Sequence, residues 1–292
     1  MGVARVPANG IEIAYETFGR RDDPALVLVM GLGTQMIAWP DEMCAQLAKR
    51  GHFVVRFDNR DVGLSTHLHG TRAPSAIDVV VRRRRPPYSI ADMARDTLGL
   101  AAALDLGPVH VVGASMGGFI AQTAALIDPA RIRSLTLIMT STGSKRVGNP
   151  HPRLFTRLTQ SRVVADRASA QERAVETFRI IGSRGYAFDE DYLAELAGKS
   201  YDRSHDPAGY WRQLAAIAAQ PNRSALLPRL EMPALVLHGL HDPLVNVSGG
   251  LALARLLPNS TFVGYSGMGH DLPRELWPSF TDHIASTTGS AP

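Results

Sequence analysis

The chain has 292 residues, 45% of them hydrophobic, and can therefore bury a large core in one domain or in one domain with an insertion. No apolar run approaches the ~20 residues of a membrane-spanning helix, and no apolar leader opens the chain, so we expect neither a membrane span nor a signal peptide. The formal net charge is +4, and subtracting the four adjacent charges of Arg82–Arg85 leaves a remainder near zero, which disfavours a nucleic-acid-binding surface.

Two local features of the composition carry further expectations. Cys44 is the single cysteine, which excludes an internal disulfide and disfavours a cysteine-based zinc site. It lies in a stretch with helical spacing, where we expect a buried, unreactive thiol, and a reducing, cytoplasmic setting fits. Arg82–Arg85 are followed by "PPY" and are expected in a solvated loop; steering of anionic ligands and oligomer contacts are the alternatives. The sequence sets no oligomeric state.

Apolar runs that recur along the chain predict the strands of one sheet. The first run alternates, and those after it are mostly continuous, as a sheet buried on both faces requires. The expected strands occupy residues 11–19, 25–31, 53–58, 109–115, 132–140, 234–239 and 260–267. Segments with helical spacing lie between most of them, at residues 38–51, 88–107, 117–129, 249–258 and 275–286. Alternating strands and helices predict a mainly parallel, doubly wound α/β fold.

Local signals mark where some of these helices begin and end. Ser89 and Asp92 have the spacing of a capping box and open the second helix, which is expected to close on Gly107. Gly51 is expected to follow the C-terminus of the first helix.

One region interrupts the alternation of strands and helices. From about residue 143 to 228 no strand is expected, and four helical segments occur instead. Helices inserted between two strands of an open sheet are placed over the carboxyl ends of the strands, where ligands bind. We therefore predict a core of residues 1–142 and 229–292, with a helical cap at 143–228.

The stretch "HVVGASMGGFIAQT" predicts a nucleophile. Ser115 stands between a buried strand and a helix in the pattern Gly113-x-Ser115-x-Gly117. A side chain on so sharp a turn is held by a strained backbone, and glycines two residues to either side relieve the crowding. The helix that follows directs its first N–H groups toward developing negative charge.

A serine nucleophile needs a base and a group that orients the base. Asp242 follows the strand "ALVLHG", and His270 lies in the glycine-rich loop after the next strand, in the chain order Ser, Asp, His. Both residues fall at carboxyl ends of strands, on the same rim as Ser115. His238 and His241 are the rival bases, and both are expected to be neighbours of the acid instead.

An oxyanion hole completes the expected site. One donor is the backbone N–H of Met116, directly after the nucleophile. The other donor is expected from the loop after residues 25–30. The Leu32 N–H is preferred, because Gly31 lets the backbone turn inward, and the Gly33 N–H is the second candidate.

On these residues the chain resembles the α/β-hydrolase superfamily over essentially its whole length. It is most similar to small bacterial serine esterases of the aclacinomycin methylesterase and cofactor-free haloperoxidase-like branch. The resemblance is carried by "LVLVMGLGTQMIAWPDE", "VVRFDNRDVGLST", "HVVGASMGGFIAQ", "MPALVLHGLHDPLV" and "GMGHDLP". In "RFDNRDVGLST", Asp58, Arg60 and Asp61 are expected to form internal ion pairs. Met30-Gly31 departs from the His-Gly of many relatives, so the hydrogen bonds that support this loop must differ.

The resemblance implies a serine carboxylesterase that needs no metal or organic cofactor and acts on a small to medium, fairly apolar ester. A perhydrolase or haloperoxidase-like activity and carbon–carbon bond hydrolysis on the same triad are the alternatives, and a non-catalytic ligand receptor is an alternative of another class. Trp39, near the oxyanion loop, is the expected substrate contact. The aromatic residues of the cap, which are expected mainly to pack its helices, are Phe155, Phe178, Tyr186, Tyr192, Tyr201, Tyr210 and Trp211.

Overall fold

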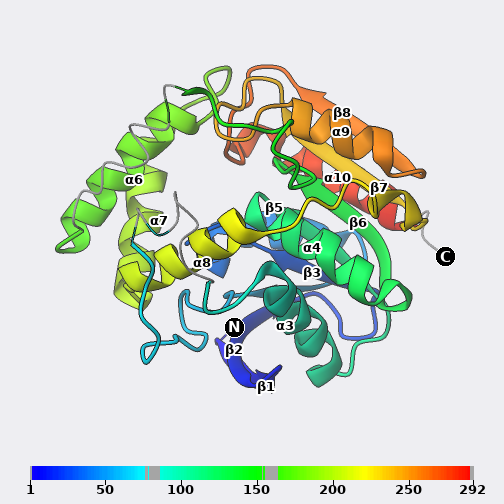
Figure 1. Ribbon diagram of the computed structural model, residues 1–292, viewed down its shortest axis with the longest axis horizontal. Helices are drawn as coiled ribbons and strands as arrows, with labels where there is room; N and C mark the ends of the chain where they lie inside the picture. The colour runs from blue at the N-terminus through cyan, green and yellow to red at the C-terminus, as the bar shows by residue number, and fades with distance from the viewer. Residues whose placement is uncertain (1, 76–77, 79–85, 153, 155–163, 290–292) are drawn as a thin grey trace.

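The computed structural model describes residues 2–75, 78, 86–152, 154 and 164–289, which are coloured along the chain in Figure 1. Arg82–Arg85, Phe155 and most of the helical segment expected at residues 153–167 lie outside the described residues.

A single sheet of eight strands forms the centre of the described structure, in the order β1-β2-β4-β3-β5-β6-β7-β8. The first pairings, β1 with β2 and β2 with β4, are antiparallel, and every other neighbouring pair is parallel. The strands are β1 (Ala4–Ala8), β2 (Ile11–Phe18), β3 (Ala25–Val29), β4 (Phe53–Phe57), β5 (Val109–Ala114), β6 (Ile132–Ile138), β7 (Ala234–Gly239) and β8 (Ser260–Tyr265). The expected α/β fold with a mainly parallel sheet is confirmed.

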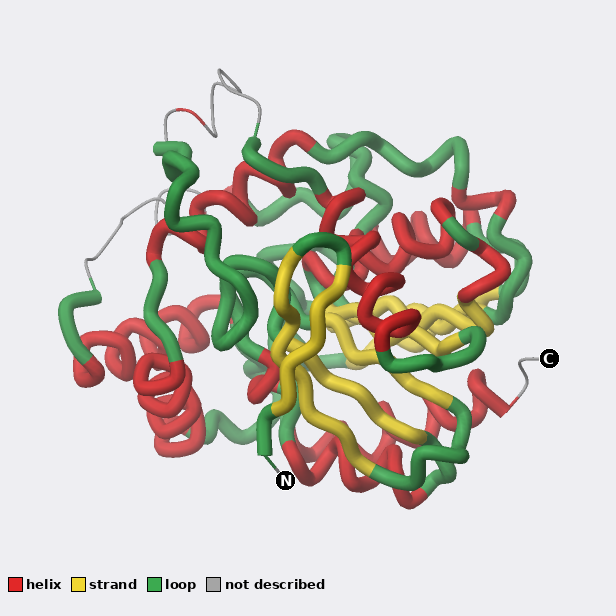
Figure 2. Tube along the Cα trace, turned by 90° about the horizontal axis from the view of Figure 1, so that it is seen from below, coloured by secondary structure: helices red, strands yellow, loops and turns green. Residues whose placement is uncertain are grey.

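Helices cover both faces of this sheet (Figure 2). Buried residues of α3, α4 and α9 join the core on one face, and those of α1 and α10 join it on the other. The described α-helices are α1 (Asp41–Lys49), α3 (Ile90–Ala103), α4 (Met116–Ile127), α6 (Arg167–Ile181), α7 (Glu190–Arg203), α8 (Pro207–Ala219), α9 (Ser248–Leu256) and α10 (Trp277–Gly289).

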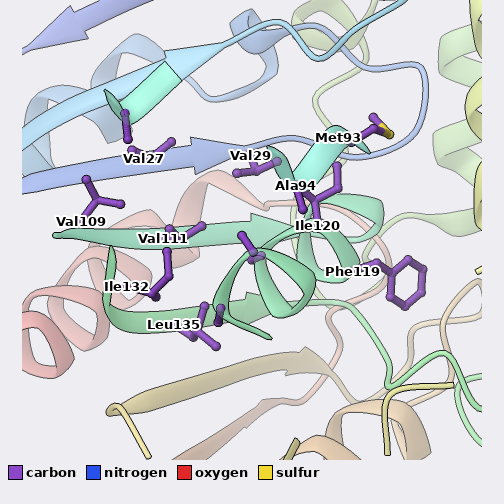
Figure 3. Close-up of a cluster of buried hydrophobic side chains, with 14 of the residues drawn as sticks. Val27, Val29, Met93, Ala94, Val109, Val111, Phe119, Ile120, Ile132 and Leu135 are labelled. Atoms are coloured by element: carbon purple, nitrogen blue, oxygen red, sulfur yellow. The ribbon is translucent and has the colours of Figure 1, made fainter. Parts of the chain in front are cut away.

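The core follows from the alternation of side chains along strands that are buried on both faces. Val27 and Val29 of β3 face the cluster that includes Val111 of β5 and Ile120 of α4 (Figure 3). Leu28, between them in sequence, faces the opposite cluster. Both sets are almost fully excluded from water, so the continuous apolar runs in the sequence correspond to two hydrophobic layers.

Two differences from the expected elements have local causes. The edge strand β1 was not predicted. Ala8 is its one buried residue, and its sequence shows no alternation of apolar and polar residues. The helix α3 begins at the expected capping box of Ser89 and Asp92 but ends at Ala103, before the expected Gly107. Asp105 takes the left-handed conformation after the helix, with φ of 50°.

Three described α-helices, α6, α7 and α8, lie between β6 and β7 in sequence, and we call residues 164–219, which contain them and their connections, the helical insertion. In Figure 1, α6 and α7 stand to one side of the sheet, and α8 runs from them back toward it. As expected, the described residues between 143 and 228 contain no strand. Among the described helices, none combines the length and the apolar character needed to cross a membrane.

Cys44 lies in α1 and is fully buried, as expected. Burial raises the pKa of its thiol to about 12. The thiolate, which is the reactive form, is therefore disfavoured at neutral pH.

Candidate active site

Ser115 occupies the turn between β5 and α4 in a strained backbone conformation, with φ of 54° and ψ of −115°. Its N–H donates to the Ile138 carbonyl (2.9 Å), and its own carbonyl accepts from the Thr140 hydroxyl (2.8 Å). The last residue of β6 and the segment after it thus fix both the N–H and the carbonyl of Ser115. These bonds hold Ser115 at the carboxyl end of the parallel strands.

The glycines around Ser115 are required by close backbone approaches. A Cβ atom on Gly113 would lie 2.3 Å from the Gly117 carbonyl oxygen, and one on Gly117 would lie 2.1 Å from the Val29 carbonyl oxygen. Any side chain at either position would push the start of α4 away from the sheet. The relief of crowding expected from the sequence is therefore confirmed.

The structure brings the three predicted catalytic side chains into one hydrogen-bonded chain. His270 Nε2 lies 3.0 Å from Ser115 Oγ, and His270 Nδ1 lies 2.7 Å from Asp242 Oδ2. Because a carboxylate only accepts hydrogen bonds, Nδ1 carries the proton, and Nε2 is left to accept from the serine hydroxyl. His270 and Asp242 are both buried, with 8% and 4% of their surfaces exposed.

The orientation of Asp242 is fixed by backbone donors. Its Oδ1 accepts from the N–H groups of Leu244 and Val245, both at 2.8 Å, so Oδ2 is left to face His270. His238, a rival base, donates from Nε2 to the Val245 carbonyl (2.8 Å) and lies 3.8 Å from Asp242. Burial lowers the pKa of His238, which favours its neutral form.

The other rival base, His241, supports the loop that carries His270. Its Nδ1 accepts from the Gly267 N–H at 3.0 Å. Among the described histidines, His270 is the one that contacts Ser115. Asp271, directly after His270, lies in a loop, is half-buried and is hydrogen-bonded to Ser183 of the segment that follows α6.

The loop after β3 lies directly against the nucleophile. A Cβ atom on Gly31 would stand 3.2 Å from the Ser115 Cβ. The Gly33 N–H donates to Gln213 Oε1 of α8 at 2.7 Å, whereas the Leu32 N–H makes no hydrogen bond within the described part of the chain. Met116 is the first residue of α4, where N–H groups have no partner within the helix. Among the described residues, the N–H groups of Leu32 and Met116 thus have no hydrogen-bond partner, whereas that of Gly33 is occupied.

The acidic and basic residues after β4 form the internal ion pairs that the sequence predicted. The pairs are Asp58–Arg203, Arg60–Asp96 and Asp61–Arg212. Two of these arginines belong to the helical insertion, so buried charges join α7 and α8 to the core.

One group of side chains has the composition of a metal site. Asp61, His67 and Asp206 each place a ligand atom within 4.8 Å of the others. Both carboxylate oxygens of Asp61, however, accept from Arg212 at 2.8 Å, and His67 lies 2.9 Å from Asp206. These contacts already compensate the acidic charges, so we assign the group to the ion-pair network.

The structure does not support the expected substrate contact of Trp39. Its side chain is fully buried in the second hydrophobic cluster, on the α1 and α10 face of the sheet. Trp39 is close to the oxyanion loop in sequence, but this closeness does not determine the direction of its ring, which points into the core. Tyr210 of α8 is the aromatic residue that lies against this loop, since a Cβ on Gly33 would stand 2.7 Å from its ring.

A cavity of about 900 Å³ opens between the loop after β6 and the end of α8, and none of Ser115, Asp242 and His270 lines it. Phe119, one helical turn after Ser115, and Val245, which donates to Asp242, both line it. Ile217 and Ala218 of α8 form another part of the wall. A volume of this size can hold a drug-sized molecule.

Comparison with known proteins agrees with this geometry. The family described as alpha/beta hydrolase fold matches residues 24–273. The chain belongs to the alpha/beta hydrolase fold family. It is accordingly an enzyme of the hydrolase class, and the expected resemblance is confirmed.

Relatives of this α/β hydrolase extend over its full length. It is 29% identical over 315 residues to rhodomycin D methylesterase DauP of Streptomyces sp. (strain C5), and the match covers 100% of this chain and 99% of that protein. It is 27% identical over 311 residues to rhodomycin D methylesterase DnrP of Streptomyces peucetius, with coverage of 100% and 99%. The crystal structure of the enol-lactonase from Burkholderia xenovorans LB400 shares its fold, with a TM-score of 0.76, 24% identity and coverage of 98% and 100%.

The sequence did not predict that side chains of the helical insertion contact the loops of the active site. Gln213 contacts the oxyanion loop at Gly33, and Ser183 contacts the loop that carries His270. Each is separated from its partner by more than 80 residues, and no local pattern surrounds it. Asp271 gave no signal of its contact with Ser183, because aspartate is common in loops.

Proposed function

We propose that this α/β hydrolase is a carboxylic ester hydrolase that works through an acyl-enzyme on Ser115. The observation that carries the proposal is the continuous chain of hydrogen bonds from Ser115 Oγ through His270 to Asp242 at a strained turn. The full-length similarity to two rhodomycin D methylesterases supports an ester as the substrate.

In the acylation step, Ser115 Oγ attacks the ester carbonyl carbon while His270 Nε2 takes the hydroxyl proton. Asp242 holds the imidazole in the required tautomer and stabilises the positive charge that forms on it. The N–H groups of Leu32 and Met116 donate to the oxyanion, and one such donor contributes about 2.7–4 kcal/mol in the transition state.

The leaving alcohol takes the proton from His270 as its bond to the carbonyl carbon breaks. Water then occupies the vacated position, loses a proton to His270 and attacks the acyl-enzyme. Collapse of the second tetrahedral intermediate returns the proton to Ser115 Oγ and releases the carboxylic acid. No step in this cycle calls for a metal or an organic cofactor.

Residues 143–228 act as a cap over the site in this proposal. The 900 Å³ cavity, which is bordered by Phe119 of α4 and by Val245 after β7, takes the part of a small to medium, fairly apolar ester that lies away from the carbonyl. Phe119, Ile217, Ala218 and Val245 form an apolar part of its wall that suits such a group. The remaining lining is mostly polar and includes Lys145, Arg146 and Asn149.

Hydrolysis of p-nitrophenyl esters from acetate to dodecanoate tests the proposal. We expect turnover that varies with chain length, with an optimum that reports the size of the cavity. A fluorophosphonate probe should block the activity and form a single adduct, which peptide mass spectrometry should map to Ser115.

Other outcomes of the same assay point to the alternatives. An enzyme that is inert on every ester, or an adduct on another residue, contradicts the proposal. Activity that appears only when hydrogen peroxide is the acceptor favours a perhydrolase, and turnover of a diketone favours carbon–carbon bond hydrolysis. Tight ligand binding without turnover indicates a receptor.

Filling the cavity should change the chain-length preference. In the variant Ala218→Trp we expect kcat/KM for the dodecanoate ester to fall by about 10-fold or more, because the indole occupies space used by the long chain. The acetate ester should react within about twofold of the wild-type rate. Ala219→Trp is the matched control, since Ala219 is exposed and does not line the cavity. An equal loss for short and long esters would argue against this location.

A further inference from the structure

The segment that follows α6 is bonded to the loop that carries His270. The His270 N–H donates to the Ile181 carbonyl at 2.7 Å, and the Gly185 N–H donates to the Gly267 carbonyl at 3.0 Å. These backbone bonds join residues 181–185 of the helical insertion to the histidine loop, residues 267–271. The insertion therefore contacts the base itself, and not only the walls around it.

A side-chain bridge lies between these two backbone bonds. The Gly269 N–H donates to Ser183 Oγ at 2.9 Å, and Ser183 Oγ in turn donates to the Asp271 carboxylate. The Ser183 N–H also donates to Asp271 Oδ2, at 3.1 Å. Ser183 thus holds the residues immediately before and after His270.

The bridge is buried and tightly packed. Ser183 has 7% of its surface exposed. A Cβ atom on Gly269 would lie 2.4 Å from the Gly182 carbonyl oxygen, and one on Gly182 would lie 3.2 Å from Asp271 Oδ2. With backbones this close, the histidine loop has no room to shift while residues 181–185 stay docked.

The nucleophile side of the site shows a parallel arrangement. Gln213 of α8 is fully buried, accepts from the Gly33 N–H and donates to the Arg60 carbonyl at 2.8 Å. The helical insertion therefore holds both the oxyanion loop and the histidine loop, through two different elements. This second, independent contact favours a general role of the insertion in assembling the site.

We propose that Ser183 and Asp271 are positioning residues that couple the docking of the helical insertion to the placement of His270 beside Ser115. The proposal rests on the proposed esterase function. His270 Nε2 stays within hydrogen-bonding distance of Ser115 Oγ while residues 181–185 are docked. Displacement of this segment removes four hydrogen bonds from residues 269 to 271 and releases the base. The site is thereby complete only with the insertion in place.

The test compares Ser183→Ala, Ser183→Thr and Asp271→Asn with the wild type. In Ser183→Ala and Asp271→Asn we expect kcat for a p-nitrophenyl ester to fall by about 10- to 100-fold while KM stays within about twofold, because a misplaced base slows chemistry without weakening ground-state binding. Ser183→Thr keeps the hydroxyl and should recover most of the lost kcat. Ser200→Ala is the matched control, since its hydroxyl bonds within its own helix to the Leu196 carbonyl.

A second measurement needs no substrate. The low-field proton resonance of His270 Nδ1–H, bound to Asp242, should be visible by NMR in the wild type and in Ser200→Ala. It should be lost through exchange in Ser183→Ala and Asp271→Asn. If the wild type hydrolyses no ester, the proposed function fails, yet this resonance still decides the coupling.

Three results would overturn the coupling. The first is a kcat that stays within about twofold of wild type in both Ser183→Ala and Asp271→Asn. The second is an unchanged Nδ1–H resonance in those variants. The third is a loss of activity that tracks a loss of folded protein by circular dichroism and that Ser183→Thr does not restore, which would make the role structural.

Discussion

Replacing Ser115 with alanine is expected to lower kcat for ester hydrolysis by about 10⁴- to 10⁶-fold. The variant loses the atom that forms the acyl-enzyme, and the oxyanion donors alone supply only the residual rate. Steady-state assays with p-nitrophenyl butyrate measure this change, and thermal unfolding should show that the variant remains folded.

The double variant with His270→Ala provides the sharper comparison. Residues that act as one unit give effects that do not multiply, so the double variant should be about as inactive as Ser115→Ala alone. A multiplicative loss would mean that His270 acts independently of Ser115. Retention of more than about a tenth of the wild-type activity in Ser115→Ala would exclude Ser115 as the nucleophile.

The second large effect is expected in stability. Replacing Arg212 with methionine should lower the free energy of unfolding by about 3–5 kcal/mol, because it leaves the Asp61 carboxylate buried without its partner. Both side chains are almost completely excluded from water, at 1% and 0% exposure. Urea denaturation followed by circular dichroism measures the change, provided that the transition is two-state.

Two further variants separate this effect from a general loss of contacts. Asp61→Asn combined with Arg212→Met removes both charges and should regain much of the stability. Asp282→Asn breaks the exposed pair with Arg50 and should cost no more than about 1 kcal/mol. If Arg212→Met costs as little as Asp282→Asn, the buried pair does not anchor α8.

The sequence predicted the elements whose signal is local. Strands β3 to β7 appear as apolar runs because both of their faces are buried, and the elbow at Ser115 appears because its glycines are required within two residues of it. The order of Ser115, Asp242 and His270 placed them on one rim, and their distances agree with that placement.

Contacts made by the helical insertion could not be predicted in this way. No local sequence pattern around Gln213, Ser183 or Arg212 indicates a contact with the core. Their partners are 86 to 180 residues away in sequence. Such pairs depend on how α8 and the end of α6 dock on the core, which is a property of the tertiary structure. Trp39 illustrates the same limit, since proximity in sequence to the oxyanion loop did not determine which way its ring points.

The backbone conformation of Ser115 places stability and activity in opposition. A non-glycine residue with φ of 54° and ψ of −115° carries strain of about 1–3 kcal/mol, and glycine would adopt the same conformation with less. A chain that had no use for the hydroxyl would therefore gain stability from glycine at this turn, because glycine lacks the Cβ atom that causes the strain. The hydroxyl that the proposed mechanism needs is therefore held at a cost in folding stability.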